Sequence, residues 1–385
     1  MKRLARLILT LTLATASVAW LAGAGEAWRW PLPEWVPPPA VPADNPMSAD
    51  KVLLGRHLFY DKRLSRDGSL ACASCHEQAR AFTDGKAVSK GVTGESGTRS
   101  AMSLTNVAYL PVLTWQNPQL GSLEVQSLIP LFGEHPVEMG LAGREQQVFA
   151  MLQSEPVYRD LFARAFPDEA RQGDAALYSL ATLTRALASF QRTLLSFASA
   201  YDRYRYGGQA GALSPAARRG EELFFGEKLE CYHCHGGFNF TDNLKHARSP
   251  FVETGFHNTG LYNVDGRGAY PTPSPGIVEF TGEARDAGRF RTPTLRNVAV
   301  TAPYMHDGSI ATLPQVLREH YARAGRAVTL GQGLNPLRSE LIAGFQISES
   351  EIADVVAFLE SLTDPGFLTD PRYGDPWPVQ RQARR

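Results

Sequence analysis

The chain has 385 residues, of which 43% are hydrophobic and 20% are charged. This composition is typical of a globular protein with two domains or one large one, and it excludes a disordered chain, a collagen and a coiled coil. Lys plus Arg and Asp plus Glu both number 39, so the formal net charge is zero, and a general nucleic-acid binder, which normally carries a basic excess, is also excluded.

The first residues have the pattern of a secretory signal peptide, which we place at residues 1–27. Basic residues at the start precede an apolar run over 7–21 and a group of small residues at 22–24. An uncleaved membrane anchor is the alternative, but the run contains several hydroxyl side chains and is short for a spanning helix. We therefore expect a periplasmic protein with no membrane span after removal of the signal. The proline-rich segment 31–39 predicts an extended arm on the surface.

Two short motifs contain all four cysteines. Residues 72–76 read CASCH and residues 231–235 read CYHCH. In such C-x-x-C-H motifs the two thiols bind the vinyl groups of a haem, and the histidine lies under the iron as an axial ligand. A thioredoxin-like dithiol does not need the histidine, and a zinc site formed from both pairs leaves both histidines unexplained. The predicted attachment residues are Cys72, Cys75 and His76 for one haem c and Cys231, Cys234 and His235 for a second.

The surroundings of the two motifs repeat, which indicates a duplicated chain. Residues 55–64 (GRHLFYDKRL) match residues 220–229 (GEELFFGEKL), and we expect each to form an amphipathic helix that leads into a haem loop. The tripeptide FTD follows each motif, and SLTNVA at 103–108 matches TLRNVA at 294–299. Each half is therefore expected to be a small haem-binding domain.

Apolar residues at helical spacing predict buried helices over residues 183–197 and 349–362. The glycine- and proline-rich stretch 254–281 predicts a long loop over a haem edge. The expected fold is mainly α, with two cytochrome c-like haem domains and long irregular loops. Residues 28–205 are expected to form the N-terminal haem domain and residues 206–385 the C-terminal one.

The halves differ in the residues that can lie on the far side of each haem. The second half offers candidate iron ligands, namely Met305, His306, His320 and Tyr321. An iron with two strong axial ligands transfers electrons, whereas an iron with an open position binds peroxide or oxygen. The asymmetry therefore predicts different roles for the two haems.

The first half offers Trp115, Gln126, Pro130 and Glu138, and none of these is a habitual haem ligand. Pro130 falls about where the ligand helix of the second half ends, and a proline cannot coordinate iron, so we expect the first haem to be five-coordinate and reactive. Glu138 would then move a proton between the oxygens of hydrogen peroxide, and Gln126 would orient the bound molecule. A surface glutamate and a satisfied loop glutamine are the alternatives.

These motifs resemble those of the bacterial di-haem cytochrome c peroxidase and MauG superfamily over nearly all of the mature chain. The segments that carry the resemblance are 54–61 (LGRHLFYD), 72–76, 136–139 (PVEM), 231–235, 292–297 (TPTLRN) and 301–308 (TAPYMHDG). Within the superfamily, residues 41–48, 256–262 and 308–313 most resemble the methanobactin-associated di-haem enzymes, MbnH.

The resemblance implies a di-haem peroxidase arrangement. His76 would carry a high-spin, peroxide-reactive haem, and His235 a low-spin haem for electron transfer. Trp115 matches the tryptophan that relays electrons or holes between the haems. Glu138 and Gln126 match the distal acid and its neighbour.

A calcium ion between the haems is also implied. Asn106 and the backbone carbonyls of Thr301 and Pro303 match its ligands. Hard oxygen ligands of this kind are those that calcium prefers.

The sixth ligand of the second haem separates two branches of the superfamily. Its peroxidases use a methionine, which raises the reduction potential, whereas MauG-like enzymes use a tyrosine, which favours oxidised states. This chain has His320 and Tyr321 at the end of its ligand helix. Strict counting puts His320 at the ligand position. We expect Tyr321 to be the ligand, with a local helix irregularity absorbing the extra residue, and keep His320 as the alternative.

The resemblance thus implies a MauG/MbnH-like oxidase that uses hydrogen peroxide, through high-valent haem iron, to oxidise a residue on a periplasmic partner protein. By analogy with MbnH and its partner MbnP, that residue is a tryptophan and the product is kynurenine. The alternative is a cytochrome c peroxidase that reduces hydrogen peroxide with electrons from small donor proteins. A pure di-haem electron carrier is a third hypothesis, and it predicts two six-coordinate irons.

Overall fold

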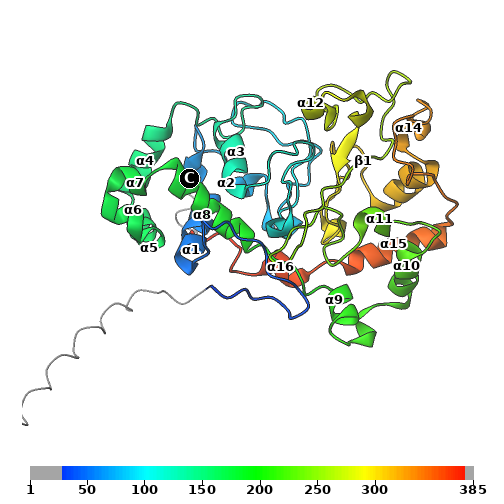
Figure 1. Cartoon of the computed structure of the whole chain (residues 1–385), viewed down its shortest axis with the longest axis horizontal. Helices are drawn as coiled ribbons and strands as arrows, with labels where there is room; N and C mark the ends of the chain where they lie inside the picture. The colour runs from blue at the N-terminus through cyan, green and yellow to red at the C-terminus, as the bar shows by residue number, and fades with distance from the viewer. Residues whose placement is uncertain (1–27, 378–385) are drawn as a thin grey trace, which may run out of the picture.

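The computed structural model describes residues 28–377, so the signal peptide expected at 1–27 lies outside the described residues. The fold is mainly α, as expected, with one small antiparallel sheet (Figure 1). Within 28–377, no helix is long and apolar enough to cross a membrane. Long segments without regular structure connect the helices.

The α-helices of the described chain are short, and most lie between irregular segments. They are α1 (Ala49–Phe59), α2 (Leu123–Gln126), α3 (Leu128–Phe132), α4 (Glu145–Ser154), α5 (Pro156–Ala165), α6 (Pro167–Gln172), α7 (Asp174–Leu177), α8 (Leu180–Arg192), α9 (Ala200–Arg205), α10 (Pro215–Phe225), α11 (Tyr232–His235), α12 (Val278–Thr281), α13 (Leu313–Gln315), α14 (Arg326–Thr329), α15 (Glu349–Ser361) and α16 (Pro365–Thr369). Strand β1 (Phe256–Asn258) pairs antiparallel with β2 (Arg289–Arg291). A π turn, η8 (Val316–His320), and a 3-10 turn, η9 (Tyr321–Arg323), follow α13.

The first core is built on the crossing of α1 with α8 (Figure 1). The two backbones approach closely at Gly55, where a Cβ atom would lie 1.9 Å from the carbonyl oxygen of Ala186. The Ser179 hydroxyl caps α8 by accepting from the Thr182 amide. The helix expected over 183–197 is shorter than predicted, because α8 ends at Arg192 and the chain then continues extended with Leu194 and Phe197 still buried.

The second core repeats this crossing with α10 and α15, on the other side of the molecule (Figure 1). Gly220 is the equivalent of Gly55, and a Cβ atom there would lie 2.0 Å from the carbonyl oxygen of Asp354. The Ser348 hydroxyl and the Glu351 carboxylate form a capping box at the start of α15. The internal repeat read from the sequence therefore corresponds to the same helix pair in each half.

The C-terminal segment returns to the first core. The Phe367 ring in α16 lies 5.6 Å from the Phe82 ring, centroid to centroid, and the Trp377 indole donates to the carbonyl of His57 at 3.2 Å. Residues 365–377 thus pack with the first half of the chain. The domain boundary at residue 205 stays a prediction. In the structure, the C-terminal residues 365–377 also contact the first half.

Candidate functional site

The two haem-attachment histidines have the same hydrogen bond. Nδ1 of His76 lies 2.8 Å from the carbonyl oxygen of Phe82, and Nδ1 of His235 lies 3.1 Å from that of Phe240. Both phenylalanines belong to the repeated FTD segments. Because a carbonyl can only accept, each Nδ1 donates, and burial lowers the pKa of both rings. Each histidine is therefore neutral with Nε2 free to bind a metal, as in an oriented axial ligand.

A cavity of about 280 Å³ lies beside the second motif. Cys231, Cys234 and His235 line it together with Tyr321, whereas His320 is not among the lining residues. Most of the other lining side chains are apolar, which suits a large flat cofactor with few polar contacts. The residues present thus fit a covalently attached haem c in the second half.

The chain before Tyr321 contains the irregularity that the sequence spacing required. The Thr312 hydroxyl caps α13, and the helix then widens into the π turn η8 before tightening into η9. A π turn accommodates one more residue than an α-helical turn. Tyr321 thereby reaches the cavity, and burial raises the pKa of its phenol.

His306 and Met305 also line the cavity. The imidazole of His306 stacks on Phe290, with ring centroids 3.7 Å apart, and burial lowers its pKa to about 4. The backbone amide of Ser100 donates to the His306 carbonyl at 2.8 Å. These contacts give His306 a structural place between the two halves.

The first-half candidates gather near the first motif. The Met139 amide donates to the Pro130 carbonyl at 2.9 Å, which places Glu138 beside α3. Burial raises the pKa of the Glu138 carboxyl, and its charge in turn contributes to raising the pKa of both the Cys72 and Cys75 thiols. Gln126, at the end of α2, is partly buried two residues before α3 begins.

Trp115 connects the two halves. Its indole lines the cavity of the second half and donates to the Ser100 carbonyl at 2.9 Å. Its own carbonyl accepts from the backbone amide of Arg291, in β2, at 2.8 Å. The tryptophan is therefore fixed at both its backbone and its ring between segments of the two halves.

The chain is similar to known proteins along nearly its whole length. A family model described as di-haem cytochrome c peroxidase matches residues 49–210. The methylamine utilization protein MauG of Methylophilus methylotrophus is 33% identical over 93% of this chain and 94% of its own. The chain belongs to the MauG and di-haem cytochrome c peroxidase family. The resemblance read from the sequence is thereby confirmed.

Two further similarities lie within this family. The cytochrome-c peroxidase IdrP1 of Denitromonas iodatirespirans is 37% identical over 97% of this chain and 98% of its own. A crystal structure of a MauG-like protein associated with microbial copper homeostasis is 47% identical, with a TM-score of 0.86, and covers 91% of this chain and 100% of that one. Family membership makes the protein a di-haem oxidoreductase with two haem c cofactors.

In this MauG-family chain, the expected calcium ligands are not all brought together by described contacts. Thr301 and Pro303 line the cavity. Asn106 is completely buried, and its side chain is engaged elsewhere, because its Oδ1 accepts from the Ser196 amide at 2.8 Å and its Nδ2 donates to Asn239 Oδ1 at 2.9 Å. These bonds compete with metal ligation by Asn106.

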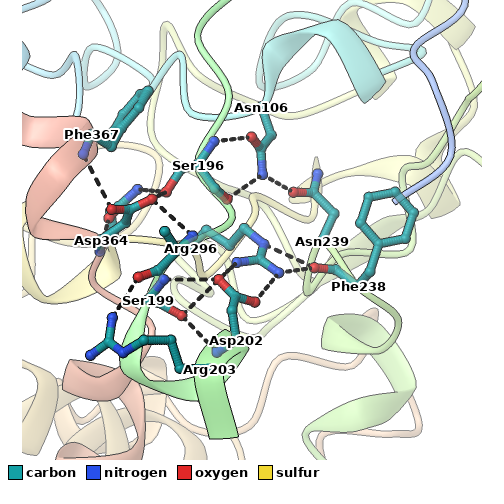
Figure 2. Close-up of polar contacts among 12 residues, drawn as sticks. Asn106, Ser196, Ser199, Asp202, Arg203, Phe238, Asn239, Arg296, Asp364 and Phe367 are labelled. Carbon is teal, nitrogen blue, oxygen red and sulfur yellow. Dashed lines mark hydrogen bonds and ion pairs between the residues drawn. The ribbon is translucent and has the colours of Figure 1, made fainter. Parts of the chain in front are cut away.

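Sequence reasoning missed a buried ion pair behind the second haem motif. Figure 2 shows the guanidinium of Arg296 between Asp202 and the backbone carbonyl of Phe238. Arg296 lies 2.9 Å from Asp202 Oδ2, and both side chains are almost completely buried. The pair therefore anchors the loop from Phe238 to Phe240, whose last carbonyl orients His235. Arg296 lies in the repeated segment TLRN, so the sequence contained a signal for it. The residues around Asp202 contain no pattern that indicates a buried charge.

A second missed contact lies at the other side of that loop. Asp242, in the repeated FTD segment, pairs with His257 of β1, with Oδ2 2.6 Å from Nε2. The hydrogen bond to Asp242 is the largest cause that raises the pKa of His257 to about 10. Cys234 lies close to both, but its thiol belongs to the haem-attachment motif. In the first half, the equivalent Asp84 accepts instead from the Ser89 hydroxyl at 2.7 Å.

Proposed function

We propose that the protein is a MauG-like oxidase that uses hydrogen peroxide to oxidise a residue on a periplasmic partner protein. The observation that carries the proposal is that the π turn brings Tyr321 into the cavity beside His235. A tyrosinate ligand stabilises the oxidised states that an oxidase must accumulate, whereas a methionine raises the potential and suits a peroxidase.

Haem iron, when bound at both motifs, supplies the redox chemistry and the site at which peroxide reacts. Glu138 takes a proton from one peroxide oxygen and returns it to the other, which becomes the leaving water. Burial raises the pKa of this carboxyl, which favours its acting as a proton donor as well as a proton acceptor. Gln126 orients the peroxide by hydrogen bonding, and Pro130, whose side chain has no ligand atom, would leave room for peroxide at a haem held by His76.

Trp115 carries electrons between the two halves, and Tyr321, together with His235, would hold the haem iron of the second half. The partner's oxidised residue is a tryptophan, and the product is kynurenine. Two peroxides then deliver two oxygen atoms to the indole and leave as two waters, and hydrolysis of the opened ring releases formate. We further propose that residues 1–27 direct the protein to the periplasm.

The decisive experiment combines the di-haem protein with hydrogen peroxide and one of two reductants. One is an MbnP-like protein, whose tryptophans are followed by mass spectrometry, and the other is a reduced small c-type cytochrome, whose oxidation is followed by absorbance. We expect conversion of a tryptophan and slow cytochrome oxidation. Rapid cytochrome turnover with an unmodified partner would contradict the proposal.

That contrary result would favour the second candidate, a cytochrome c peroxidase. The 37% identity with a relative named as a cytochrome-c peroxidase supports this candidate. A ferric protein with only low-spin EPR signals would instead favour the di-haem electron carrier, because it would leave no open iron position.

Calcium is a separate proposal. The carbonyl oxygens of Thr301 and Pro303 are suited to it, and Asn106 would have to release the Ser196 amide to join them. Elemental analysis of the purified holoprotein before and after dialysis against a chelator tests this, and a protein that never contains calcium would contradict it.

A further inference from the structure

We propose that the backbone amide of Arg326 holds His320 away from the second haem and so makes Tyr321 its axial residue. His320 is in this view a positioning residue. The inference rests on the proposed role of Tyr321 and adds what selects it over its neighbour. His320 and Tyr321 can both ligate iron. The sequence spacing favours His320, whereas Tyr321 is the one that lines the cavity.

The π turn decides which of the two side chains faces the cavity. The amide of Tyr321 donates to the carbonyls of Leu317 and Val316, so the last bond spans five residues. The Gly325 amide likewise donates to the His320 carbonyl at 2.9 Å, again five residues apart. Regular α-helical spacing over the same residues would instead put His320 at the position that Tyr321 now has.

The widened turn is supported from outside the helix. The last carbonyls of a helix have no intrahelical partners, and the carbonyl of Glu319, near the end of η8, accepts from the Thr329 hydroxyl at 2.6 Å. Thr329 lies at the end of α14, the helix that Arg326 begins. The same short helix thus supplies both the support for the turn and the amide that binds His320.

Both ring nitrogens of His320 are unavailable to a metal in this arrangement. Nδ1 accepts from the Arg326 amide at 2.8 Å, and this amide is free to donate because the first residue of a helix has no intrahelical partner. With Nδ1 as an acceptor, the neutral ring carries its proton on Nε2. That nitrogen has no hydrogen-bond partner among the described residues, and the ring is completely buried.

An unpaired buried donor costs free energy, so the surroundings must hold the ring in place. One contact that does so is with Tyr321 itself. The two rings meet at 75°, with centroids 4.6 Å apart. His320 therefore packs against the phenol that it would otherwise replace.

The test uses ferric di-haem holoprotein and its EPR and visible spectra. In Tyr321→Phe, we expect the second haem to lose its low-spin signal without gaining a bis-histidine one, because His320 stays bound to Arg326. Adding Arg326→Pro removes the amide at a position where helices tolerate proline, and the ψ of Gly325, 142°, lies in the range that a following proline favours. This double variant is expected to show a low-spin bis-histidine signal.

The matched control is Tyr321→Phe with Arg326→Ala, which removes the same side chain but keeps the amide, and it should behave as Tyr321→Phe alone. A bis-histidine signal in Tyr321→Phe alone, or identical spectra for the proline and alanine double variants, would overturn the proposal. A wild-type spectrum without tyrosinate ligation would instead contradict the proposed role of Tyr321.

Amide hydrogen exchange gives a second measurement that does not depend on the proline variant folding. In the wild-type protein, we expect the Arg326 amide to be protected, and in His320→Ala to exchange faster while the amides of α15 are unchanged. An Arg326 amide that exchanges equally fast in both proteins would overturn the proposal.

Discussion

Ser196 and Asp364 occupy equivalent positions in the two halves and bond to each other, with Ser196 Oγ 3.3 Å from Asp364 Oδ2. The Ser196 amide donates to the side-chain oxygen of Asn106, and the Asp364 amide donates to that of Asn297, both at 2.8 Å. Asn106 and Asn297 are themselves equivalent in the repeat. The polar contacts around this point are shown in Figure 2. The two haem units are therefore in contact through residues that are equivalent in the internal repeat.

We expect the buried pair of Arg296 and Asp202 to be essential for stability. Asp202→Ala leaves the guanidinium buried without its counter-ion, which typically costs about 3–5 kcal/mol. Urea unfolding of the holoprotein, followed by circular dichroism, measures the loss. Asp168→Ala is the matched control, because its pair with Arg171 is largely exposed and is worth at most about 1 kcal/mol. Equal losses in the two variants would contradict this prediction.

The glycines at the two helix crossings should not tolerate a methyl group. Gly55→Ala and Gly220→Ala each place a Cβ atom about 2 Å from a carbonyl oxygen, and overpacking of this kind costs about 1–3 kcal/mol or more. Gly211→Ala is the control, since a Cβ atom there meets nothing within 4 Å. Thermal unfolding should show lower melting temperatures for the first two variants only.

Glu138→Gln should separate catalysis from folding. Loss of a general acid–base group lowers the rate with peroxide about 10²–10⁴-fold, whereas the resting haem spectra should not change. Stopped-flow absorbance with hydrogen peroxide measures this. A variant that reacts as fast as the wild-type protein would remove Glu138 from the proposed mechanism.

The same variant has a predicted pH signature in stability. Burial raises the pKa of Glu138 in the folded protein, so the ionised carboxylate destabilises the fold above that pKa, and protonation relieves the cost as the pH falls through it. Glu138→Gln should therefore be at least as stable as the wild-type protein at neutral pH. Its advantage should disappear in acid, below the carboxyl's ordinary pKa. Denaturant titrations at several pH values check the sign.

Trp115→Phe should slow transfer between the halves without changing the first reaction with peroxide. Phenylalanine fills much of the same space but is far harder to oxidise, and it loses the bond to the Ser100 carbonyl. Rapid-scan absorbance separates the two haems by their spin states. Trp35→Phe is the control, because Trp35 stacks on Tyr206 at 3.8 Å, away from the cavity lining. Unchanged transfer in Trp115→Phe would contradict the relay.

The parts of the site with local patterns were predictable from the sequence. The C-x-x-C-H motifs and the repeated FTD segments lie a few residues apart, and they form the paired histidine contacts in both halves. The predicted helix end at residue 197 was wrong, because α8 ends at Arg192. Leu194 and Phe197 are buried in the extended segment that follows, and their spacing in the sequence is the same as that of buried residues in a helix.

Contacts between distant residues were not predictable. Asp202 and Arg296 are 94 residues apart in the chain, and nothing around Asp202 indicates a buried charge. Tyr321 points into the cavity because of the π turn over Val316–His320. The residue spacing indicated that the helix must be irregular, but it did not show where.

The return of residues 365–377 to the first core has a consequence for biogenesis. Phe367 packs against Phe82, whose carbonyl orients His76, yet the two phenylalanines are made at opposite ends of synthesis. Chains emerge and fold from the N-terminus onwards, so the first haem unit stays incomplete until the second has been translated. A chain that ended before residue 365 would therefore lack part of its first haem unit even if its second unit were whole.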